Sequence, residues 1–319
     1  MGVSLITMTN SVPYFIAMQD AAKAEAPKLN FDLTLAAGKQ DGDEQGQIKA
    51  IEDAIAKGDK GILITPNGPG VANAIKQARD AGIYVIALEA SLPASATDFT
   101  FATDNVNAGT SIGEWAAKSL NGKPARIAML GFFNDKAVSF DYQRHQGFLK
   151  GMGIDVKDPK IKGDEAPTGK YSGGDYTIVC NEATNGAEEP ARSALETCLT
   201  KDPSINVVFA GSEPIGFGAH NALKAAGKQD QAIILAVDGG CTGVKGVKEG
   251  RLSGTAQQYP GKMAQIGLDA MAKYFKDGTK PTVTPGLDFH DTGVNLVTDK
   301  PVDGVKSIDT TEGSKNCWG

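Results

Sequence analysis

Histidine is scarce in this sequence, and long apolar runs are missing from it. The three histidines, His145, His220 and His290, lie far apart, and each lacks a partner at metal-ligand spacing. This distribution argues against a histidine-based metal centre. No apolar run approaches the roughly 20 residues that a membrane-spanning helix requires. Both absences favour a soluble globular protein over a metalloenzyme or a helical membrane protein.

The short motifs of common catalytic and nucleotide-binding sites are also missing. The sequence contains no GxxxxGK[ST] phosphate loop, no GxGxxG after a strand, no GxSxG elbow and no HExxH. Carboxylates are numerous, but none forms a recognisable acid–base pair. We therefore expect a protein that is not an enzyme and that uses no cofactor and no metal.

Positive charge is not concentrated in any segment. The 32 lysines and arginines and the 38 aspartates and glutamates give a formal net charge of −6. A mildly acidic chain without a basic patch argues against nucleic acid or an anionic membrane as the main partner. The length of 319 residues is long for one domain and suits two α/β domains, each with its own core.

The four cysteines include no CxxC pair, and their number fits either buried thiols or two disulfides. The disulfide alternative suits an oxidising compartment. Cys180 ends a predicted strand, and Cys198 lies on the helix that follows. Cys241 opens another predicted helix, and Cys317 lies in the C-terminal tail. Our hypothesis is that Cys180 pairs with Cys198 and Cys241 with Cys317.

A buried strand followed by an amphipathic helix is the repeating pattern of the chain. It predicts strands at 3–8, 31–35, 61–65, 83–88, 99–102, 126–130, 176–181, 206–209, 233–237 and 253–257. Helices are predicted at 13–26, 43–56, 71–81, 107–120, 139–151, 188–200, 214–226, 241–249 and 260–276. Residues 155–175 indicate a surface loop or hairpin. The fold class is therefore α/β, with parallel sheets that carry helices on both faces.

Parallel sheets bind ligands outside the carboxyl ends of their strands, so residues just after strands are the candidate ligand-binding residues. They carry hydroxyl, amide, carboxylate and aromatic groups, which suit a neutral polyol such as a sugar. Phosphate would instead call for a glycine-rich cradle and cations. The candidates are Asn10, Ser11, Tyr14, Phe15, Glu89, Asn105, Asp141, Tyr142, Ser212, Asp238 and Gln258.

These segments resemble the type I periplasmic sugar-binding proteins, the ribose-binding-like group, over nearly the whole chain. The resemblance is carried by residues 10–15 (NSVPYF), 62–66 (ILITP), 103–105 (TDN), 146–148 (QGF), 236–239 (AVDG) and 257–260 (QQYP). The fructose-binding branch is resembled by residues 238–243 (DGGCTG), 286–289 (GLDF) and 317–319 (CWG). The resemblance implies two Rossmann-like lobes with a ligand cleft between them. Three hinge crossings would lie near 103–105, 258–260 and 288–292.

The resemblance also implies roles for single residues. Tyr14 and Phe15 would sandwich the sugar, Asn105 and Gln258 would contact it at the hinge, and Asp238 would accept hydrogen bonds from its hydroxyls. The sequence departs from ribose binders at three places. Glu89-Ala90 replaces an Asp-Arg pair of the ribose binders. Tyr142, beside Asp141, replaces an arginine, and Ser212 replaces an asparagine. These departures argue against ribose and fit a different or larger sugar. The resemblance to the fructose-binding branch favours fructose, with ribose, arabinose, another hexose or a polyol as alternatives.

The implied first lobe comprises residues 1–104 and 259–290, and the implied second lobe comprises 105–258 and 291–319. The family further implies a periplasmic monomer that closes on a monosaccharide and is recognised by the membrane permease of an ABC importer. The present sequence shows no signal peptide. By itself this fits either a cytosolic protein or a mature form with an added start, and the implied periplasmic location favours the mature form.

Several of these features have other interpretations. Asp104 is expected to cap a helix, Trp115 to lie in a core, and Arg144 to form a structural ion pair, while Asp238 is either a ligand residue or a cap. A transcriptional regulator on this fold would need a helix-turn-helix headpiece, for which a first strand at residue 3 leaves no room. A sugar-processing enzyme would need a base or a metal. A binding protein coupled to a chemoreceptor fits the sequence equally well.

Overall fold

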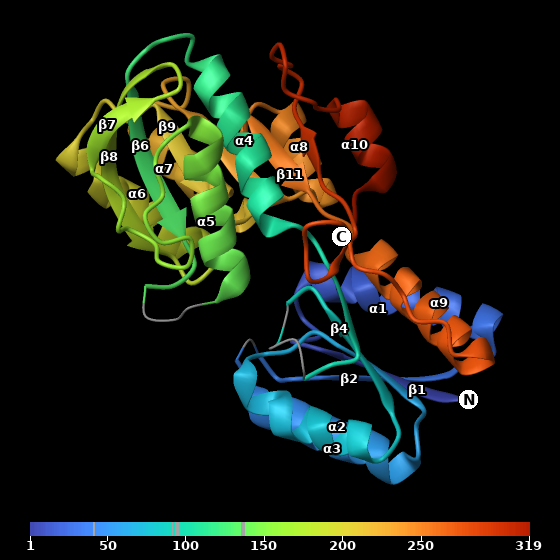
Figure 1. Ribbon diagram of the computed structural model, residues 1–319. Coiled ribbons are helices and arrows are strands. Elements are labelled where there is room, and N and C mark those ends of the chain that lie inside the picture. The colour runs from blue at the N-terminus through green and yellow to red at the C-terminus, as the bar shows by residue number, and fades with distance from the viewer. Residues whose placement is uncertain (41, 91, 93–95, 135–137) are drawn as a thin grey trace. The chain divides into compact units, whose positions relative to one another are not determined.

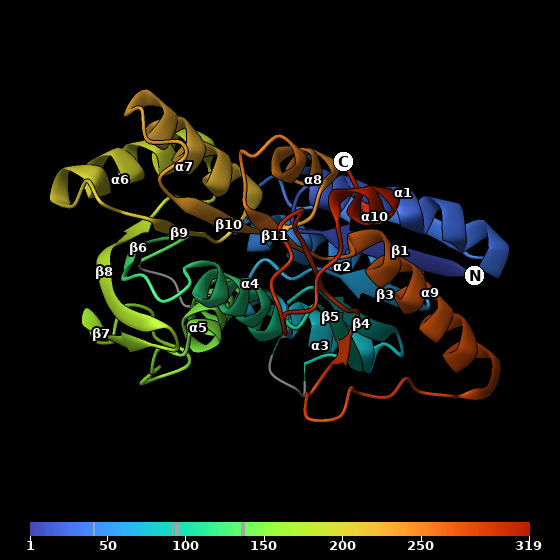
Figure 2. The ribbon, with the colours of Figure 1, turned by 90° about the horizontal axis from the view of Figure 1, so that it is seen from above.

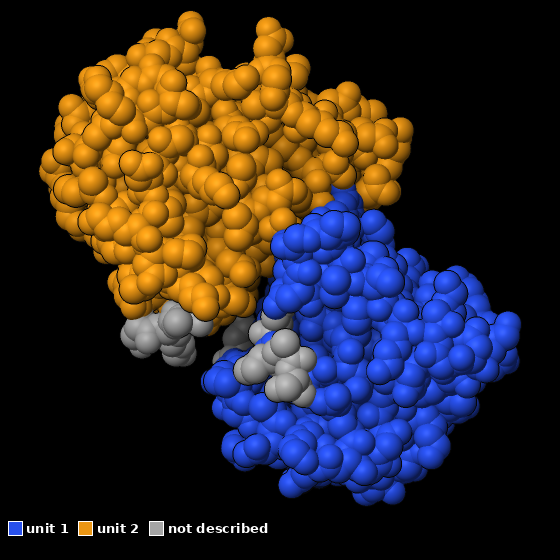
Figure 3. All heavy atoms as spheres, viewed as in Figure 1, with its two compact units in different colours: residues 1–103, 259–293, 318–319 blue, residues 104–258, 294–317 orange. Residues whose placement is uncertain are grey.

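The computed structural model describes residues 1–40, 42–90, 92, 96–134 and 138–319. The chain divides into unit 1, residues 1–103, 259–293 and 318–319, and unit 2, residues 104–258 and 294–317 (Figure 3). The chain thus passes between the units after Thr103, Gln258 and Gly293, and again after Cys317. The sequence-based division placed Asp104 in the first lobe and residues 291–293 and 318–319 in the second. The fourth passage was not expected.

Unit 1 is built on a six-stranded sheet in which every pair is parallel, in the order β12-β5-β4-β3-β1-β2. Adjacent residues of β3, such as Leu63 and Ile64, are fully buried, so both faces of the sheet need a cover. The strands are β1 (Gly2–Thr7), β2 (Asp32–Ala37), β3 (Gly61–Ile64), β4 (Tyr84–Leu88), β5 (Phe99–Ala102) and β12 (His290–Asp291).

Helices cover both faces of this sheet (Figures 1 and 2). Leu63 packs in the cluster formed with α1 (Pro13–Glu25) and α9 (Pro260–Asp277), whereas Ile64 packs in the cluster formed with α2 (Glu44–Lys57) and α3 (Ala72–Asp80). A proline stands in the first turn of both α1 and α9, where its missing N–H costs no hydrogen bond. Two short 3-10 helices, η1 (Ala26–Leu29) and η2 (Pro69–Val71), complete the unit.

Unit 2 contains a seven-stranded sheet in the order β13-β11-β10-β9-β6-β8-β7. Its central pairs are parallel, but β7 and β13 join the two edges antiparallel. The hairpin of β7 and β8 begins within residues 155–175, where a loop or hairpin was predicted, whereas the antiparallel edge strand β13 was not predicted. The strands are β6 (Ala125–Gly131), β7 (Thr168–Tyr171), β8 (Gly174–Ala183), β9 (Val207–Ala210), β10 (Ile233–Asp238), β11 (Gly254–Gln257) and β13 (Asn295–Val297).

Two helix pairs cover the sheet of unit 2. One core cluster contains α4 (Asn105–Ser119) and α5 (Ser139–Met152), and the other contains α6 (Glu188–Lys201) and α7 (Glu213–Ala225). Two further helices, α8 (Cys241–Lys248) and α10 (Thr310–Asn316), pack together. Trp115 is confirmed as a core residue, 1% exposed. Asp104 is confirmed as the cap of α4, because its carboxylate accepts a hydrogen bond from the Asn107 N–H at 2.9 Å.

Glycines allow α4 and α5 to pack backbone against backbone. A Cβ atom at Gly109 would collide with the carbonyl group of Arg144, and one at Gly147 would collide with the carbonyl group of Val106. Gly113 and Gly151 face the opposite helix in the same way. Only glycine permits so close an approach. The first turns of α4 are therefore held close to the middle of α5, around Arg144 and Gly147.

Both disulfides of our hypothesis are present. Cys180 of β8 bonds Cys198 of α6, with the two Cα atoms 5.8 Å apart. Cys241, the first residue of α8, bonds Cys317, which follows α10, with the Cα atoms 4.8 Å apart. Among the described cysteines none is free. The predicted pairing is thus confirmed.

We expect protein purified without reductant to resist alkylation and to gain the mass of four hydrogens on reduction. Replacing the buried pair in Cys180→Ser/Cys198→Ser should lower the free energy of unfolding by about 2–4 kcal/mol, because the disulfide restricts the unfolded chain. Intact mass with and without alkylation, and urea titration, measure these effects. Four thiols that alkylate freely in native, non-reduced protein would contradict the pairing.

Candidate functional site

Unit 1 gathers an aromatic pair and a carboxylate at the carboxyl edge of its sheet. Tyr14 and Phe15 lie in the first turn of α1, the helix that follows β1, and Glu89 follows β4 directly. All three are 7% exposed. The Tyr14 hydroxyl donates a hydrogen bond to the Glu89 carboxylate, and the two aromatic rings meet edge to face at 5.3 Å. The structure therefore brings these three predicted site residues together.

Glu89 holds an uncommon backbone conformation. Its φ angle is +66°, in the left-handed region that residues with a Cβ atom seldom adopt. Its N–H donates to the carbonyl of Phe101 on β5 at 3.0 Å, which ties the residue to the neighbouring strand. Strained residues of this kind are concentrated at functional sites. The strain at Glu89 thus agrees with a functional role.

Asn10 and Ser11 lie in the loop between β1 and α1, and both are exposed. The Ser11 hydroxyl lies 2.8 Å from the hydroxyl of Thr9, so a local turn fixes it. Within the described contacts, neither residue joins Tyr14 and Glu89. Their predicted contact with a ligand stays a prediction.

A buried arginine forms the centre of the polar cluster in unit 2. The Arg144 side chain is only 3% exposed, so its charge needs partners inside the protein. Its Nε donates to Asn105 Oδ1 at 2.8 Å, and its Nη1 donates to the carbonyl of Gly211 at 3.0 Å. Nη1 also lies 3.6 Å from Asp238 Oδ1. The predicted ion pair is confirmed, with Asp238 as the partner, and a hydrogen bond links the same arginine to Asn105.

Asp238 ends β10 with its side chain 19% exposed. Its φ angle is +143°, again a positive value at a residue with a Cβ atom. Oδ1 accepts a hydrogen bond from Gln258 Nε2 at 3.0 Å, and Oδ2 accepts one from the Glu213 N–H at 3.4 Å. The residue that caps α8 is Gly240. Asp238 therefore does not cap the helix that follows it in sequence.

Glu213 is a neighbour of this cluster that was not among the predicted site residues. It is the first residue of α7, and it is 5% exposed. Its Oε1 accepts hydrogen bonds from the Gly239 N–H and the Thr255 hydroxyl, each at 2.8 Å. Burial, together with the nearby Asp238 carboxylate, raises the pKa of Glu213 to about 8. Glu213 thus supports the turn that carries Asp238.

The remaining predicted residues of unit 2 have different surroundings. The Ser212 hydroxyl is buried and makes no hydrogen bond within the described part of the chain. Tyr142 is half-buried, and burial raises its pKa. Asp141 is 1% exposed and accepts hydrogen bonds from the N–H groups of Phe132 at 3.0 Å and Phe133 at 3.2 Å. It also pairs with Lys162. Asp141 thus belongs to a network that fixes the backbone of Phe132 and Phe133, directly after β6.

Phe140 is an aromatic neighbour of the cluster that sequence reasoning missed. The guanidinium carbon of Arg144 lies 5.2 Å from the centre of its ring, within the range of a cation–π contact. The ring also meets Phe132 edge to face at 5.1 Å. Its position beside Asp141, in the first turn of α5, was the available signal.

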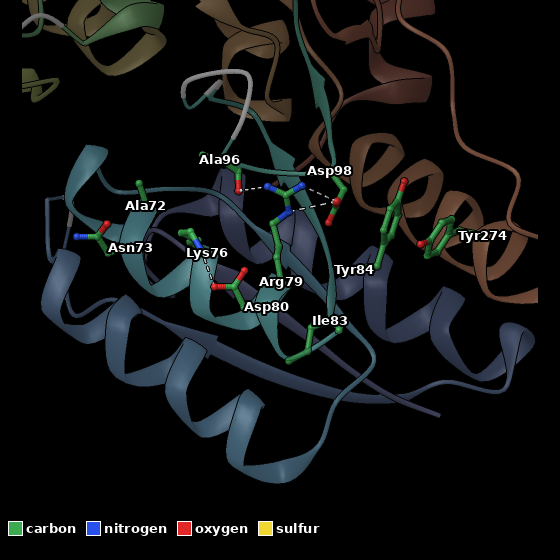
Figure 4. A pocket seen from close by; sticks show the side chains of 11 residues that line it. Ala72, Asn73, Lys76, Arg79, Asp80, Ile83, Tyr84, Ala96, Asp98 and Tyr274 are labelled. Carbon is green, nitrogen blue, oxygen red and sulfur yellow. Dashed lines mark hydrogen bonds and ion pairs between the residues drawn. The ribbon is translucent and has the colours of Figure 1, made fainter.

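A pocket of about 640 Å³ lies elsewhere in unit 1 (Figure 4). Tyr84 lines it and begins β4, whereas Glu89 follows the end of that five-residue strand, a separation of roughly 16 Å. Arg79 spans the pocket, donating to Asp98 at 2.9 Å and to the Ala96 carbonyl at 3.3 Å. Because parallel sheets bind ligands at the carboxyl edge, we give this pocket no part in the candidate site.

Within the described ranges, no three His, Cys, Asp or Glu side chains are grouped closely enough to hold a metal ion. None of the helices in the same ranges is long and apolar enough to cross a bilayer.

Residues 2–280 match the family described as periplasmic binding protein domain. The chain belongs to the periplasmic binding protein family. The ribose import binding protein of Salmonella typhimurium (strain LT2) is 25% identical over 275 residues, 86% of this chain and 84% of that protein. The galactofuranose-binding protein of Escherichia coli (strain K12) is 29% identical over 274 residues, 83% of this chain and 79% of that protein.

Solved structures of binding proteins share the fold of this periplasmic binding protein. The crystal structure of a galactofuranose binding protein matches with a TM-score of 0.75 at 26% identity, covering 93% of this chain and 94% of that one. An ABC transporter periplasmic solute binding protein from Actinobacillus succinogenes 130z, with bound D-allose, matches with a TM-score of 0.79 at 24% identity. That match covers 99% of both chains. The predicted two-lobed α/β fold with parallel sheets is thus confirmed.

We expect Glu213 to make folding stability depend on pH. A glutamate in the unfolded chain ionises near its usual pKa of 4.5, whereas in the folded protein burial raises the pKa of Glu213 to about 8. Between these values the folded state keeps a proton that the unfolded state has released. The free energy of unfolding therefore falls as the pH rises. Glu213→Gln lacks this contribution. Its free energy of unfolding, relative to that of the parent, should therefore rise by at least about 1 kcal/mol from pH 5 to pH 8.

Urea titrations at several pH values measure this difference. Glu52→Gln, which changes an exposed residue of α2, is the matched control and should run parallel to the parent. A Glu213→Gln profile that also runs parallel to the parent would show that Glu213 ionises at an ordinary pKa.

Proposed function

We propose that this periplasmic binding protein captures a monosaccharide and presents it to the membrane permease of an ABC importer. It would act in the periplasm, as a monomer and without catalysis. One observation carries the proposal: each unit places an acidic residue with a positive φ angle, Glu89 or Asp238, at the carboxyl end of a strand that pairs parallel with both its neighbours. Relatives named for ribose and for galactofuranose support a sugar as the ligand. The two disulfides suit an oxidising compartment.

The groups at these edges have the chemistry that a sugar requires. Aromatic rings such as Tyr14 and Phe15 pack against the C–H face of a sugar ring. The carboxylates of Glu89 and Asp238 accept hydrogen bonds from sugar hydroxyls, and charge-assisted bonds are the stronger kind. The amides of Asn105 and Gln258 both donate and accept. We assign Asn10, Ser11, Asp141, Tyr142 and Ser212 to further ligand contacts. Asp141 also accepts hydrogen bonds from the N–H groups of Phe132 and Phe133.

We further propose that one sugar binds groups of both units and thereby favours a closed form of the protein. A ligand shifts a conformational equilibrium only through its differential affinity for the two states. Contacts that form only when both units reach the sugar provide that difference. The permease would then recognise the closed form.

Fructose is the sugar that we propose first. This choice rests on the resemblance of residues 238–243, 286–289 and 317–319 to the fructose-binding branch. It also rests on Glu89-Ala90 and Tyr142, which stand where ribose binders carry Asp-Arg and arginine. Ribose, arabinose and other hexoses or polyols are the alternatives.

A thermal-shift screen against monosaccharides tests the proposal, because ligand at about a hundred times its Kd adds roughly 2.7 kcal/mol of stability. The sugar found should bind Asp238→Ala about ten- to a hundredfold more weakly, since its hydroxyls would face a desolvated site without an acceptor. The variant should also compact less on adding sugar. Calorimetry and small-angle scattering measure the two effects.

Asp238→Asn keeps the shape of the side chain and removes its charge, so it should bind with an intermediate affinity. Thermal unfolding without sugar confirms that both variants fold. The assignment of Asp238 fails if Asp238→Ala binds and compacts like the parent. The proposed function itself fails if no monosaccharide stabilises the parent protein.

Glu89→Gln should change the ranking of sugars more than it changes stability. The Tyr14 hydroxyl can still donate to the amide oxygen, so the local packing survives. The amide NH₂ group donates where the carboxylate accepted, which favours a different pattern of hydroxyls. Calorimetry over several sugars measures the ranking, and an unaltered order would show that Glu89 does not contact the ligand.

A further inference from the structure

The last two residues of the chain pack on the start of α1. Trp318 meets the ring of Tyr14 edge to face, with the ring centres 5.2 Å apart and the planes at 84°. It is half-buried against the core cluster that contains Tyr14 and Phe15. Gly319 lies against Pro13, since a Cβ atom at this glycine would stand 3.2 Å from the proline Cβ. Trp318 thus extends the aromatic pair of Tyr14 and Phe15.

A disulfide fixes the chain one residue before Trp318. Chain ends fray unless they are tied down, and here the tie is the bond between Cys317 and Cys241. Cys317 follows α10, whose Gly313 carbonyl accepts a hydrogen bond from Gln257 Nε2 at 3.0 Å. Consecutive Cα atoms are about 3.8 Å apart, so the disulfide confines Trp318 to a small volume.

The other cysteine of this disulfide, Cys241, lies three residues after Asp238. It is the first residue of α8 and directly follows the turn 238–240. The covalent path from Asp238 to Trp318 therefore contains only Gly239, Gly240 and the two cysteines. A single cross-link joins the turn of the unit 2 cluster to the residue that packs on Tyr14.

We propose that Trp318 is a positioning residue for the ligand site of unit 1 and that the Cys241–Cys317 disulfide holds it in place. Trp318 packs on the ring of Tyr14, and the Tyr14 hydroxyl donates to Glu89. Loss of the tryptophan would free the tyrosine ring to tilt and would loosen its bond to the carboxylate. The ligand part of this inference rests on the proposed function, whereas the position of Trp318 does not.

The two disulfides differ in exposure, which allows one to be broken without the other. Cys241 and Cys317 are half-buried, whereas Cys180 and Cys198 are 6% and 0% exposed. Dithiothreitol should therefore reduce the Cys241–Cys317 bond first. In that step the Sγ–Sγ bond breaks, the sulfurs take up two electrons and two protons, and the reagent becomes its cyclic disulfide.

Tryptophan fluorescence tests the position of Trp318 without any ligand. The sequence contains two tryptophans, so Trp115→Phe leaves Trp318 as the single emitter. In this background, Cys241→Ser/Cys317→Ser should shift the emission to longer wavelength and raise acrylamide quenching at least about twofold, because the freed tail exposes its indole ring. Cys180→Ser/Cys198→Ser is the matched control and should change neither. Subtraction of a Trp318→Phe spectrum from the parent spectrum gives the same comparison with Trp115 intact.

Calorimetry with D-fructose, D-ribose and L-arabinose tests the effect on binding. Trp318→Ala and Cys241→Ser/Cys317→Ser should each weaken binding about two- to tenfold, the size of one edge-to-face aromatic contact. Trp318→Phe should restore binding, because a smaller aromatic ring still packs on Tyr14. Combining the serine pair with Trp318→Ala should weaken binding no further than Trp318→Ala alone, because the disulfide acts through the tryptophan.

Two results would overturn the proposal: a Trp318 that stays shielded in the Cys241→Ser/Cys317→Ser variant, or a Trp318→Ala variant that binds like the parent. If none of the three sugars binds the parent, the proposed function is in question, and the fluorescence comparison alone decides whether the disulfide positions Trp318.

Discussion

The organisation of unit 2 depends on the burial of one positive charge. Arg144 is almost fully enclosed, and a buried cation is costly unless other groups neutralise it and satisfy its hydrogen bonds. Its partners, Asn105, Gly211 and Asp238, come from the start of α4 and from the ends of β9 and β10. These segments must therefore meet at the guanidinium. The glycines between α4 and α5 make that meeting possible, because a side chain at Gly109 would push apart the two helices that carry Asn105 and Arg144.

The two acidic residues, Glu89 and Asp238, have unfavourable backbone conformations that neighbouring residues stabilise. Glu89 and Asp238 have positive φ angles, and the other described residues with a Cβ atom and a positive φ angle are asparagines, which tolerate that region better. Such strain persists where surrounding bonds over-determine it. The Phe101 carbonyl accepts a hydrogen bond from the Glu89 N–H, and the Glu213 carboxyl group accepts one from the N–H of Gly239, which follows Asp238. The support of each carboxylate is thus built into the strand or helix beside it.

Most elements of this fold could be predicted from sequence, because apolar strands and amphipathic helices repeat with clear periods. The short helix α10 was not predicted, because its sequence shows no apolar periodicity. Hydrogen bonds from Thr310 to the Asp299 carboxylate hold its start instead. Most residues at the carboxyl edges could likewise be predicted, because strand ends are visible in the sequence. The ion pair of Arg144 was predicted, but neither its partners nor the role of Glu213 could be, because both depend on burial that only the packed structure creates. For the same reason, the packing of Trp318 on Tyr14 was not predictable.

The charge balance of the two clusters limits which ligands they suit. In unit 2 the positive charge of Arg144 is matched by Asp238, and Glu213, whose pKa burial raises to about 8, holds its proton at neutral pH. In unit 1 the carboxylate of Glu89 is bound by a neutral hydroxyl. The charge of Arg144 is thus already paired with a carboxylate, and an anionic ligand would have to compete with Asp238 for it. Under the proposed function, a neutral polyhydroxy ligand would instead exchange its bonds with water for bonds to these carboxylates and amides.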